Sequence, residues 1–297
     1  NSQTTNILFK PKDSYRMRGG SKKDSKTEGT NHPNGVITYF YLKDYDEKDE
    51  VSLTYFDTKG DTIKTFRSKN KKKDKLELKK GANKFVWNMT YEGAEKLKGM
   101  ILWWASLKGP KAIPGKYKVS LTVNGESVSQ PFSIIADPRS ETNLEGMKKQ
   151  FEFIKDVNKT MDNAHKSIKK IRKIKEQLSA FEAQYKEDKN VEALVEKAKK
   201  LKEQFSEIEK ALYQTQNKSG QDPLNFPIRL TNKLGHLNSL VRMGDFAPTE
   251  QDIAVKNELS KQINNQLTAF NDLVDNEIKE FNVAFNNKKL NYLFVED

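Results

Sequence analysis

The 297-residue sequence contains no cysteine. This excludes disulfide bonds, cysteine nucleophiles and thiolate metal ligands. Long hydrophobic runs are also missing: the longest apolar cluster, residues 100–105, falls well short of the roughly 18 residues that a membrane-spanning helix needs. We therefore expect no transmembrane segment. The sequence starts at Asn1 without a signal-peptide pattern, so we expect a processed or trimmed piece of a longer protein.

The residue patterns of common catalytic sites are absent as well. The three histidines, His32, His165 and His236, lie far apart in the sequence, and none has a second histidine at metal-ligand spacing. There is no glycine-rich phosphate loop and no glycine-flanked serine elbow. We expect no catalytic, cofactor-binding or metal-binding residues, and we predict that this chain alone is not an enzyme.

One acidic stretch invites a calcium hypothesis. Asp44, Asp46 and Asp49 supply the hard oxygen ligands that Ca²⁺ prefers. The spacing does not match an EF-hand loop, because Lys48 occupies a ligand position. A polar hairpin loop is the simpler interpretation.

Positive charge is concentrated in the first half. Residues 1–140 hold 27 lysines and arginines against 16 acidic residues, a net charge of +11, whereas residues 141–297 hold 26 against 25. This asymmetry predicts a domain boundary near residue 140. The densest basic cluster contains the candidate contacts for a polyanion, such as lipopolysaccharide, or for a partner protein: Lys69, Lys71, Lys72, Lys73 and Lys75. Nucleic acid is not favoured, because core packing explains the neighbouring aromatic residues.

Up to residue 140, apolar residues recur with a period of two. Such runs, separated by Asn-Gly, Lys-Gly and Pro-Gly turns, predict an antiparallel β-sandwich of the Ig-like or fibronectin-like type. The glycine- and lysine-rich residues 17–35 are expected to form a mobile loop. The predicted strands span residues 35–42, 50–56, 61–67, 82–88, 100–106, 116–123 and 127–135.

From residue 141 the period becomes helical, with apolar residues at steps of three and four. Thr142 and Glu145 have capping-box spacing, and Thr249 starts the last helix. We predict an up-and-down four-helix bundle over residues 141–297, with helices near 143–187, 190–216, 227–243 and 249–287. The expected fold class is thus an all-β domain (1–140) followed by an all-α domain.

Three tryptophans allow a sugar-stacking hypothesis. Trp87 shares a strand face with Phe85 and is expected in the core. Trp103 and Trp104 are adjacent and must point to opposite faces of a strand, so they are the candidate exposed aromatic residues. Packing is favoured over ligand contact for both.

A series of motifs runs through both halves of the sequence. In the first half these are Pro33-Asn34-Gly35, Asp57 to Gly60, Gly81, Asn83, Trp87, Gly109-Pro110, Ala112, Pro114-Gly115, Tyr117 and Asp137-Pro138-Arg139. Further motifs lie within FPIRLTNKLGHLNSLVRMGDFAPTEQ (226–251). Their order resembles the region that follows the propeller in bacterial sortilin-type or BNR/Asp-box repeat proteins, often labelled glycosyl hydrolases, in which the Ig-like sandwich is related to the flagellar hook-capping type. No Asp-box repeat occurs in this sequence.

The resemblance implies an Ig-like sandwich with a helical tail in an extracytoplasmic bacterial protein: periplasmic, at the outer membrane surface or secreted. We expect a non-catalytic interaction region whose partner is another envelope or secreted protein, the N-terminal propeller of the same polypeptide, or a glycan. Two alternatives remain open. The chain could complete the active site of a glycoside hydrolase, which needs two facing carboxylates. It could instead bind a polyanion through the cluster between Lys64 and Lys84.

Overall fold

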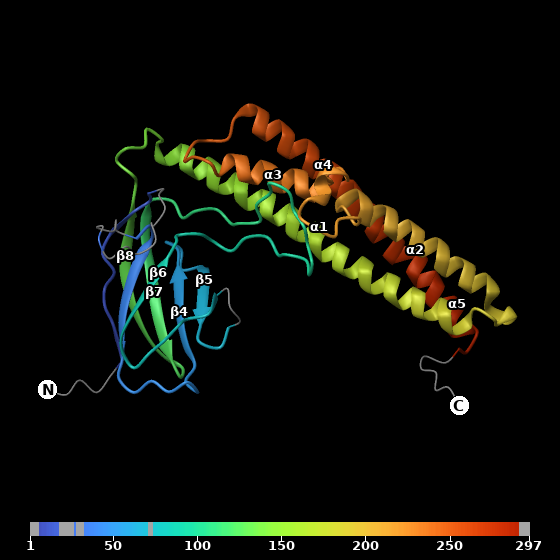
Figure 1. Ribbon diagram of the computed structural model, residues 1–297, viewed down its shortest axis with the longest axis horizontal. Helices are drawn as coiled ribbons and strands as arrows, with labels where there is room; N and C mark the ends of the chain where they lie inside the picture. Colours follow the sequence, from blue (N-terminus) through green and yellow to red (C-terminus); the bar gives the residue numbers. More distant parts are fainter. Residues whose placement is uncertain (1–5, 18–26, 28–32, 71–73, 291–297) are drawn as a thin grey trace. The chain divides into compact units, whose positions relative to one another are not determined.

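The computed structural model describes residues 6–17, 27, 33–70 and 74–290, and contains both β-sheets and α-helices (Figure 1). The chain forms two compact units, each built from separate stretches of sequence. Unit 1 comprises residues 1–93, 108–152 and 245–247, and unit 2 comprises 94–107, 153–244 and 248–297. The chain therefore passes between the units several times, not once near residue 140. The expected mobile loop at 17–35 lies mostly outside the described residues.

Unit 1 contains two sheets. Six of the seven predicted strands overlap an observed strand. The alternating apolar residues are the buried ones in β4, where Val51, Leu53 and Tyr55 point inward. The three-stranded sheet has the order β1-β3-β6 and the five-stranded sheet has the order β2-β8-β7-β4-β5. The strands are β1 (Ile7–Leu8), β2 (Ser14–Tyr15), β3 (Val36–Leu42), β4 (Val51–Phe56), β5 (Thr62–Arg67), β6 (Gly81–Trp87), β7 (Gly115–Val123) and β8 (Glu126–Ile135).

Two details of the sheets differ from the prediction. β1 and β2 were not expected, because two residues are too few to show a period. The sheet arrangement is also not wholly antiparallel, since β2 pairs with β8 in parallel.

Residues from both sheets build the core of unit 1. Trp87 is fully buried, as expected, and its ring stacks on Tyr55 with the centroids 4.5 Å apart. The Tyr55 hydroxyl shares a hydrogen bond of 2.7 Å with the Thr38 hydroxyl. Burial raises the pKa of Tyr55, so the phenol stays neutral in the core.

The predicted strand at 100–106 is wrong. These residues form no strand, and they belong to unit 2 with the rest of 94–107. Leu97 and Met100 are buried in the same hydrophobic cluster as the helices. The backbone of 101–106 bonds to Tyr213 and α3 instead of to a neighbouring strand.

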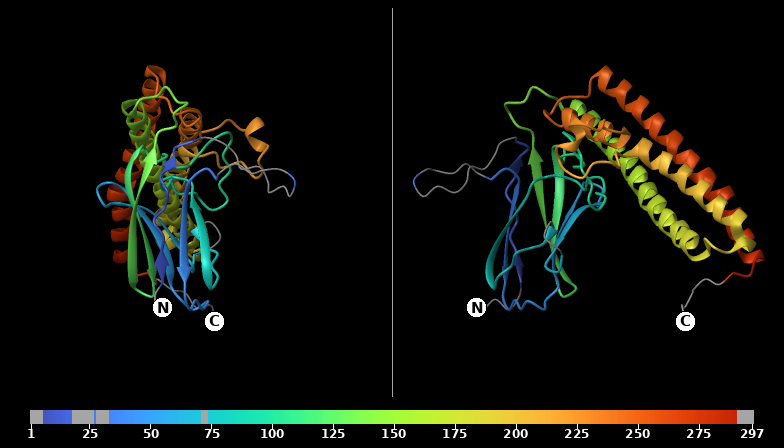
Figure 2. Two further views of the ribbon diagram at one scale, coloured as in Figure 1. Left: turned by 90° about the vertical axis from the view of Figure 1, so that its left-hand side faces the viewer. Right: turned by 45° about the vertical axis from the view of Figure 1, so that its right-hand side comes forward.

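Unit 2 is helical, and each of the four predicted helices overlaps an observed one. Figures 1 and 2 show α1, α2 and the pair α4–α5 lying side by side. The last predicted helix is continuous but contains a π-helical turn. The elements are α1 (Leu144–Tyr185), η2 (Lys189–Val191), α2 (Glu192–Leu212), η3 (Asp222–Leu224), α3 (Leu230–Val241), α4 (Glu250–Asp272), η4 (Leu273–Ile278) and α5 (Lys279–Asn287).

The helix starts test two cap predictions. At α4, the Thr249 hydroxyl accepts a hydrogen bond from the Asp252 amide, and the Asp252 carboxylate accepts one from the Thr249 amide, a complete capping box. At α1 the predicted cap is wrong by one residue. The Asn143 side chain, not Thr142, accepts a bond of 2.8 Å from the Gly146 amide.

Candidate interaction surfaces

The outer face of the three-stranded sheet consists mostly of apolar and aromatic residues. Tyr39 and Tyr41 of β3 point away from the core, because the intervening Phe40 is buried. Tyr41 lies opposite Ile7, and the Phe9 amide donates to the Tyr39 carbonyl, so Phe9 joins the same face. We name this surface the aromatic face; it consists of Ile7, Phe9, Ile37, Tyr39, Tyr41, Ala82, Lys84 and Val86.

The aromatic face is open to solvent at its centre. Phe9 and Tyr39 are each 50% exposed, and Tyr41 is 38% exposed. An antiparallel sheet of a soluble protein ordinarily turns polar residues outward. Clustered exposed aromatic side chains are typical of a binding surface.

The five-stranded sheet provides an internal comparison. On its outer face, Ser52 lies opposite Thr122, and Thr54 lies opposite Ser120 and Thr65. Hydroxyl contacts join neighbouring strands there, as between Thr54 and Thr65 at 3.1 Å. The same unit therefore carries one ordinary polar face and one aromatic face.

Positive charge accompanies the aromatic face. Lys84 lies directly opposite Tyr39. It forms no ion pair with another residue that the structure describes. A partner with a carboxylate would therefore find a free cation on this surface.

The predicted lysine cluster is divided. Lys71, Lys72 and Lys73 lie outside the described residues. The Lys69 ammonium donates to the Glu47 carbonyl oxygen at 2.5 Å, and Lys75 lies 3.8 Å from the Glu77 carboxylate.

Nearby lysines of the same stretch also have acidic partners. Lys64 pairs with Asp74 at 2.9 Å and with Glu92 at 3.2 Å, and Lys80 pairs with Asp44 at 3.1 Å. The described part of the cluster is therefore partly neutralised.

The two candidate exposed tryptophans differ. Trp104 is 76% exposed and Trp103 is 36% exposed. Their rings meet edge to face, with centroids 6.5 Å apart. The two residues are not in a strand, so the expected alternation of strand faces does not apply to them. Trp104 has a positive φ of 52°.

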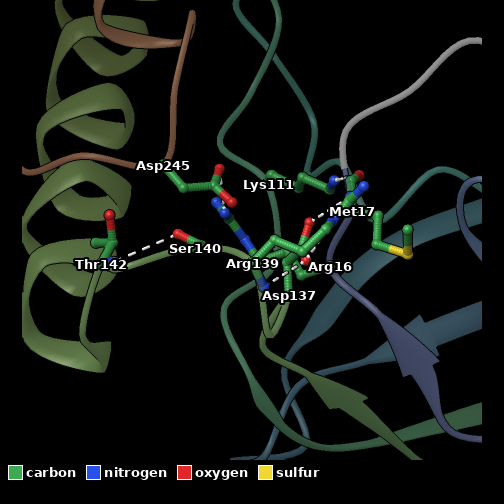
Figure 3. Close-up of polar contacts among 8 residues, drawn as sticks. All are labelled: Arg16, Met17, Lys111, Asp137, Arg139, Ser140, Thr142 and Asp245. Carbon is green, nitrogen blue, oxygen red and sulfur yellow. Dashed lines mark hydrogen bonds and ion pairs between the residues drawn. The ribbon is translucent and has the colours of Figure 1, made fainter.

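A group of polar contacts surrounds the turn after β8 (Figure 3). The Arg139 guanidinium donates to both carboxylate oxygens of Asp137, at 2.9 and 2.7 Å. This partner holds the pKa of Asp137 down, to about 2. Close by, the Lys111 ammonium donates to the Met17 carbonyl, and the Thr142 amide to the Ser140 hydroxyl.

Arg16 in the same group is a buried cation. Its Nε donates to the Ala112 carbonyl at 2.9 Å, and its Nη1 forms an ion pair with Asp245. Asp245 comes from the three-residue stretch 245–247 that belongs to unit 1. Both ends of this pair are largely enclosed, which suits a structural role.

The acidic loop is a polar turn, but the predicted hairpin is wrong, because β3 and β4 on either side of it belong to different sheets. Asp49 accepts from the Asp46 amide at 2.7 Å and from the Asn124 side chain at 2.8 Å. These bonds, the backbone bond first, lower the pKa of Asp49. Asp46 in turn accepts from the Lys48 amide. In the part of the chain that the structure describes, no group of three acidic or histidine side chains could hold a metal ion.

The histidines are separate. His32 lies outside the described residues. His165 is fully buried on α1, where its Nδ1 donates to the Glu95 carbonyl at 2.6 Å. His236 on α3 donates from Nδ1 to the Trp104 carbonyl at 3.0 Å.

Across residues 6–17, 27, 33–70 and 74–290, no helix is both long and apolar enough to span a membrane.

Comparison with known proteins leaves the family open. No family model matches the chain, and no curated protein matches it. A solved structure named pT26-6p aligns over 82% of this chain and 46% of its own, with 12% identity and a TM-score of 0.18. The chain thus spans less than half the length of that protein, and a similarity this low carries no argument about fold or function.

Proposed function

We propose that this chain is a non-catalytic interaction region of a larger cell-envelope or secreted protein, in which unit 1 is an Ig-like sandwich that binds a protein partner. The observation that carries the proposal is the aromatic face, which contrasts with the polar outer face of the other sheet. Tyrosine and phenylalanine are enriched where proteins bind one another.

The expected partner is acidic. The residues of unit 1 (1–93, 108–152 and 245–247) include 27 basic and 19 acidic residues, a net charge of +8, and Lys84 lies within the aromatic face. Two copies of a unit with this charge repel each other, which disfavours self-association. A partner surface that is apolar at its centre and carries carboxylates at its rim would complement the aromatic face.

Three ion-paired carboxylates are unsuited to act as a general acid. Asp137, Glu95 and Glu207 have lowered pKa values because Arg139, Lys169 and Lys210, respectively, bond to them. The general acid of a glycoside hydrolase needs a raised pKa.

Capture from a native envelope extract tests the proposal. Wild-type bait is compared with a Tyr39→Ser, Tyr41→Ser variant and with a control variant on the polar outer face, Thr54→Ala, Thr122→Ala. We expect a protein that wild type and control retain and that the tyrosine variant loses, with an affinity decrease of about 30-fold or more for two interface tyrosines. Equal retention by all three baits would contradict the proposal.

Charge reversal tests the chemistry of the partner. Lys84→Glu should weaken capture of the same protein, and high salt should weaken wild-type binding. Unchanged capture by this variant would contradict an acidic partner.

A further inference from the structure

Trp104 combines exposure with backbone strain. Its side chain is 76% exposed, and its φ of 52° lies in the left-handed region. Bulky residues rarely adopt this conformation, which persists only where the surroundings enforce it. Burial does not explain the strain, because this indole lies mostly in solvent.

Helix α3 holds the backbone on either side of Trp104. The Asn232 side chain accepts from the Trp103 amide at 2.8 Å and donates to the Trp103 carbonyl at 2.9 Å. The His236 ring donates to the Trp104 carbonyl at 3.0 Å. Asn232 is itself buried, so its two bonds to the backbone are well protected from water.

The next turn of α3 fixes the chain beyond Trp104. The Ser106 amide donates to the Gly235 carbonyl at 2.8 Å, and the buried Asn238 side chain donates to the Ser106 carbonyl at 2.9 Å. Gly235 has no side chain where a Cβ would lie only 3.0 Å from the Cβ of Ala105. A glycine inside a helix lowers the stability of that helix. The close approach of the backbone around Ala105 to α3 explains why position 235 is a glycine.

We propose that Trp104 is a fixed aromatic platform that binds a neutral pyranose ring of a polysaccharide. The face of an indole carries partial negative charge, which attracts the polarised C–H groups on the flat side of a sugar ring. Trp103 supports the platform edge to face. Because the Nδ1 hydrogen of His236 bonds to the Trp104 carbonyl, its Nε2 is the acceptor available to a sugar hydroxyl.

One polar side chain beside Trp104 remains within reach of a ligand. The Asn232 and Asn238 side chains are buried and bonded to the backbone, whereas the His236 ring is only partly buried. An indole face next to a single imidazole suits a ring with apolar C–H groups and hydroxyls. This site is independent of the aromatic face, since it belongs to unit 2.

Affinity electrophoresis in native gels tests the proposal. The gels contain a soluble neutral polysaccharide (β-1,3-glucan, galactomannan or xyloglucan), because neutral polymers remove the effect of the +12 net charge of the chain. Wild type should be retarded in at least one gel. Trp104→Gly should migrate as in a gel without polysaccharide, with a dissociation constant raised about tenfold or more.

The variants are chosen to keep the fold. Glycine accepts a positive φ without strain, so Trp104→Gly should retain the circular dichroism spectrum of wild type. Tyr39→Ala removes an exposed aromatic ring from unit 1 and should remain retarded.

Three results would overturn the proposal. The first is no retardation of wild type in any gel, and the second is equal retardation of wild type and Trp104→Gly. In the third, Trp104→Gly keeps its retardation but loses a protein that wild type captures from envelope extract, which would make Trp104 a protein anchor. Retardation together with loss of capture only in the Tyr39→Ser, Tyr41→Ser variant would leave both proposals standing.

Discussion

At the scale of single residues, the buried pair Arg16–Asp245 is the sharpest electrostatic feature of unit 1. Only 2% of the Arg16 side chain and 13% of the Asp245 side chain are exposed. Asp245→Asn keeps the shape and removes the charge, which leaves a buried cation without its counter-ion. We expect the free energy of unfolding to fall by about 3 kcal/mol.

Urea denaturation measures this loss. The control is Glu77→Gln, which removes an exposed partner of Lys75 and should change the stability little. A similar small effect for Asp245→Asn would mean that solvent reaches Arg16.

His165 gives a pH-dependent prediction. Burial lowers the pKa of its imidazole from 6.5, although Glu95 and Asp162 oppose the shift and Lys169 adds to it. Nε2 is buried without a hydrogen-bond partner among the described residues. The unfolded chain therefore binds a proton more readily than the folded one, and stability present above about pH 6.5 is lost as the pH falls below it.

Thermal melts between pH 7.5 and pH 5 test this assignment. His165→Asn can still donate to the Glu95 carbonyl but does not titrate, so its melting temperature should decrease less on acidification than that of wild type. Parallel curves for the two proteins would rule out His165 as the group responsible.

At the scale of elements, the glycines of the Gly-Pro and turn motifs have different roles. A Cβ on Gly109 would overlap the carbonyl oxygens of Glu92 and Tyr91, whereas Gly60, with a φ of 88°, has open space around it. Gly109→Ala must displace backbone and should cost about 3 kcal/mol or more, while Gly60→Ala should cost about 1 kcal/mol from backbone strain alone. Chemical denaturation of both variants checks the order, and equal losses would contradict it.

The elements also show what a sequence can predict. Alternation located β3 to β8, because one side of β3, β4 and β7 is buried and the second half of β8 buries Phe132 and Ile134. It failed at 100–106, where the pattern resembles a strand but the hydrogen bonds come from α3, about 130 residues later in the chain. Such non-local partners leave no periodic signal.

The aromatic face was missed for a related reason. Both sides of β3 carry large apolar or aromatic residues, such as Phe40 on one side and Tyr39 and Tyr41 on the other, so the pattern predicts a strand but does not separate core from surface. Only the burial in the structure shows that the two tyrosines face solvent. The tryptophan pair was noticed in the sequence, whereas the contacts that hold its backbone required the structure.

At the scale of the whole molecule, each unit is built from separate stretches of the chain. Residues 94–107 lie in the first half of the sequence but supply Leu97 and Met100 to the core of unit 2. A fragment ending at residue 140 would leave these apolar side chains without that core. We expect it to bind a hydrophobic dye and to aggregate, and a fragment with 94–107 replaced by a glycine-serine linker to do so less.

Size-exclusion chromatography measures the aggregation of the two fragments, and dye fluorescence measures their exposed apolar surface. A monomeric fragment 1–140 with no dye binding would show that 94–107 does not need unit 2.

Hydroxyl-radical footprinting of the chain with its captured partner tests the central claim, binding through the aromatic face, most directly. We predict that oxidation of Phe9, Tyr39 and Tyr41 decreases in the complex, because exposed aromatic rings react readily and an interface covers them. Trp104 serves as an internal reference in unit 2 and should react equally in both states. Unchanged oxidation of Phe9, Tyr39 and Tyr41 in a saturated complex would contradict the account.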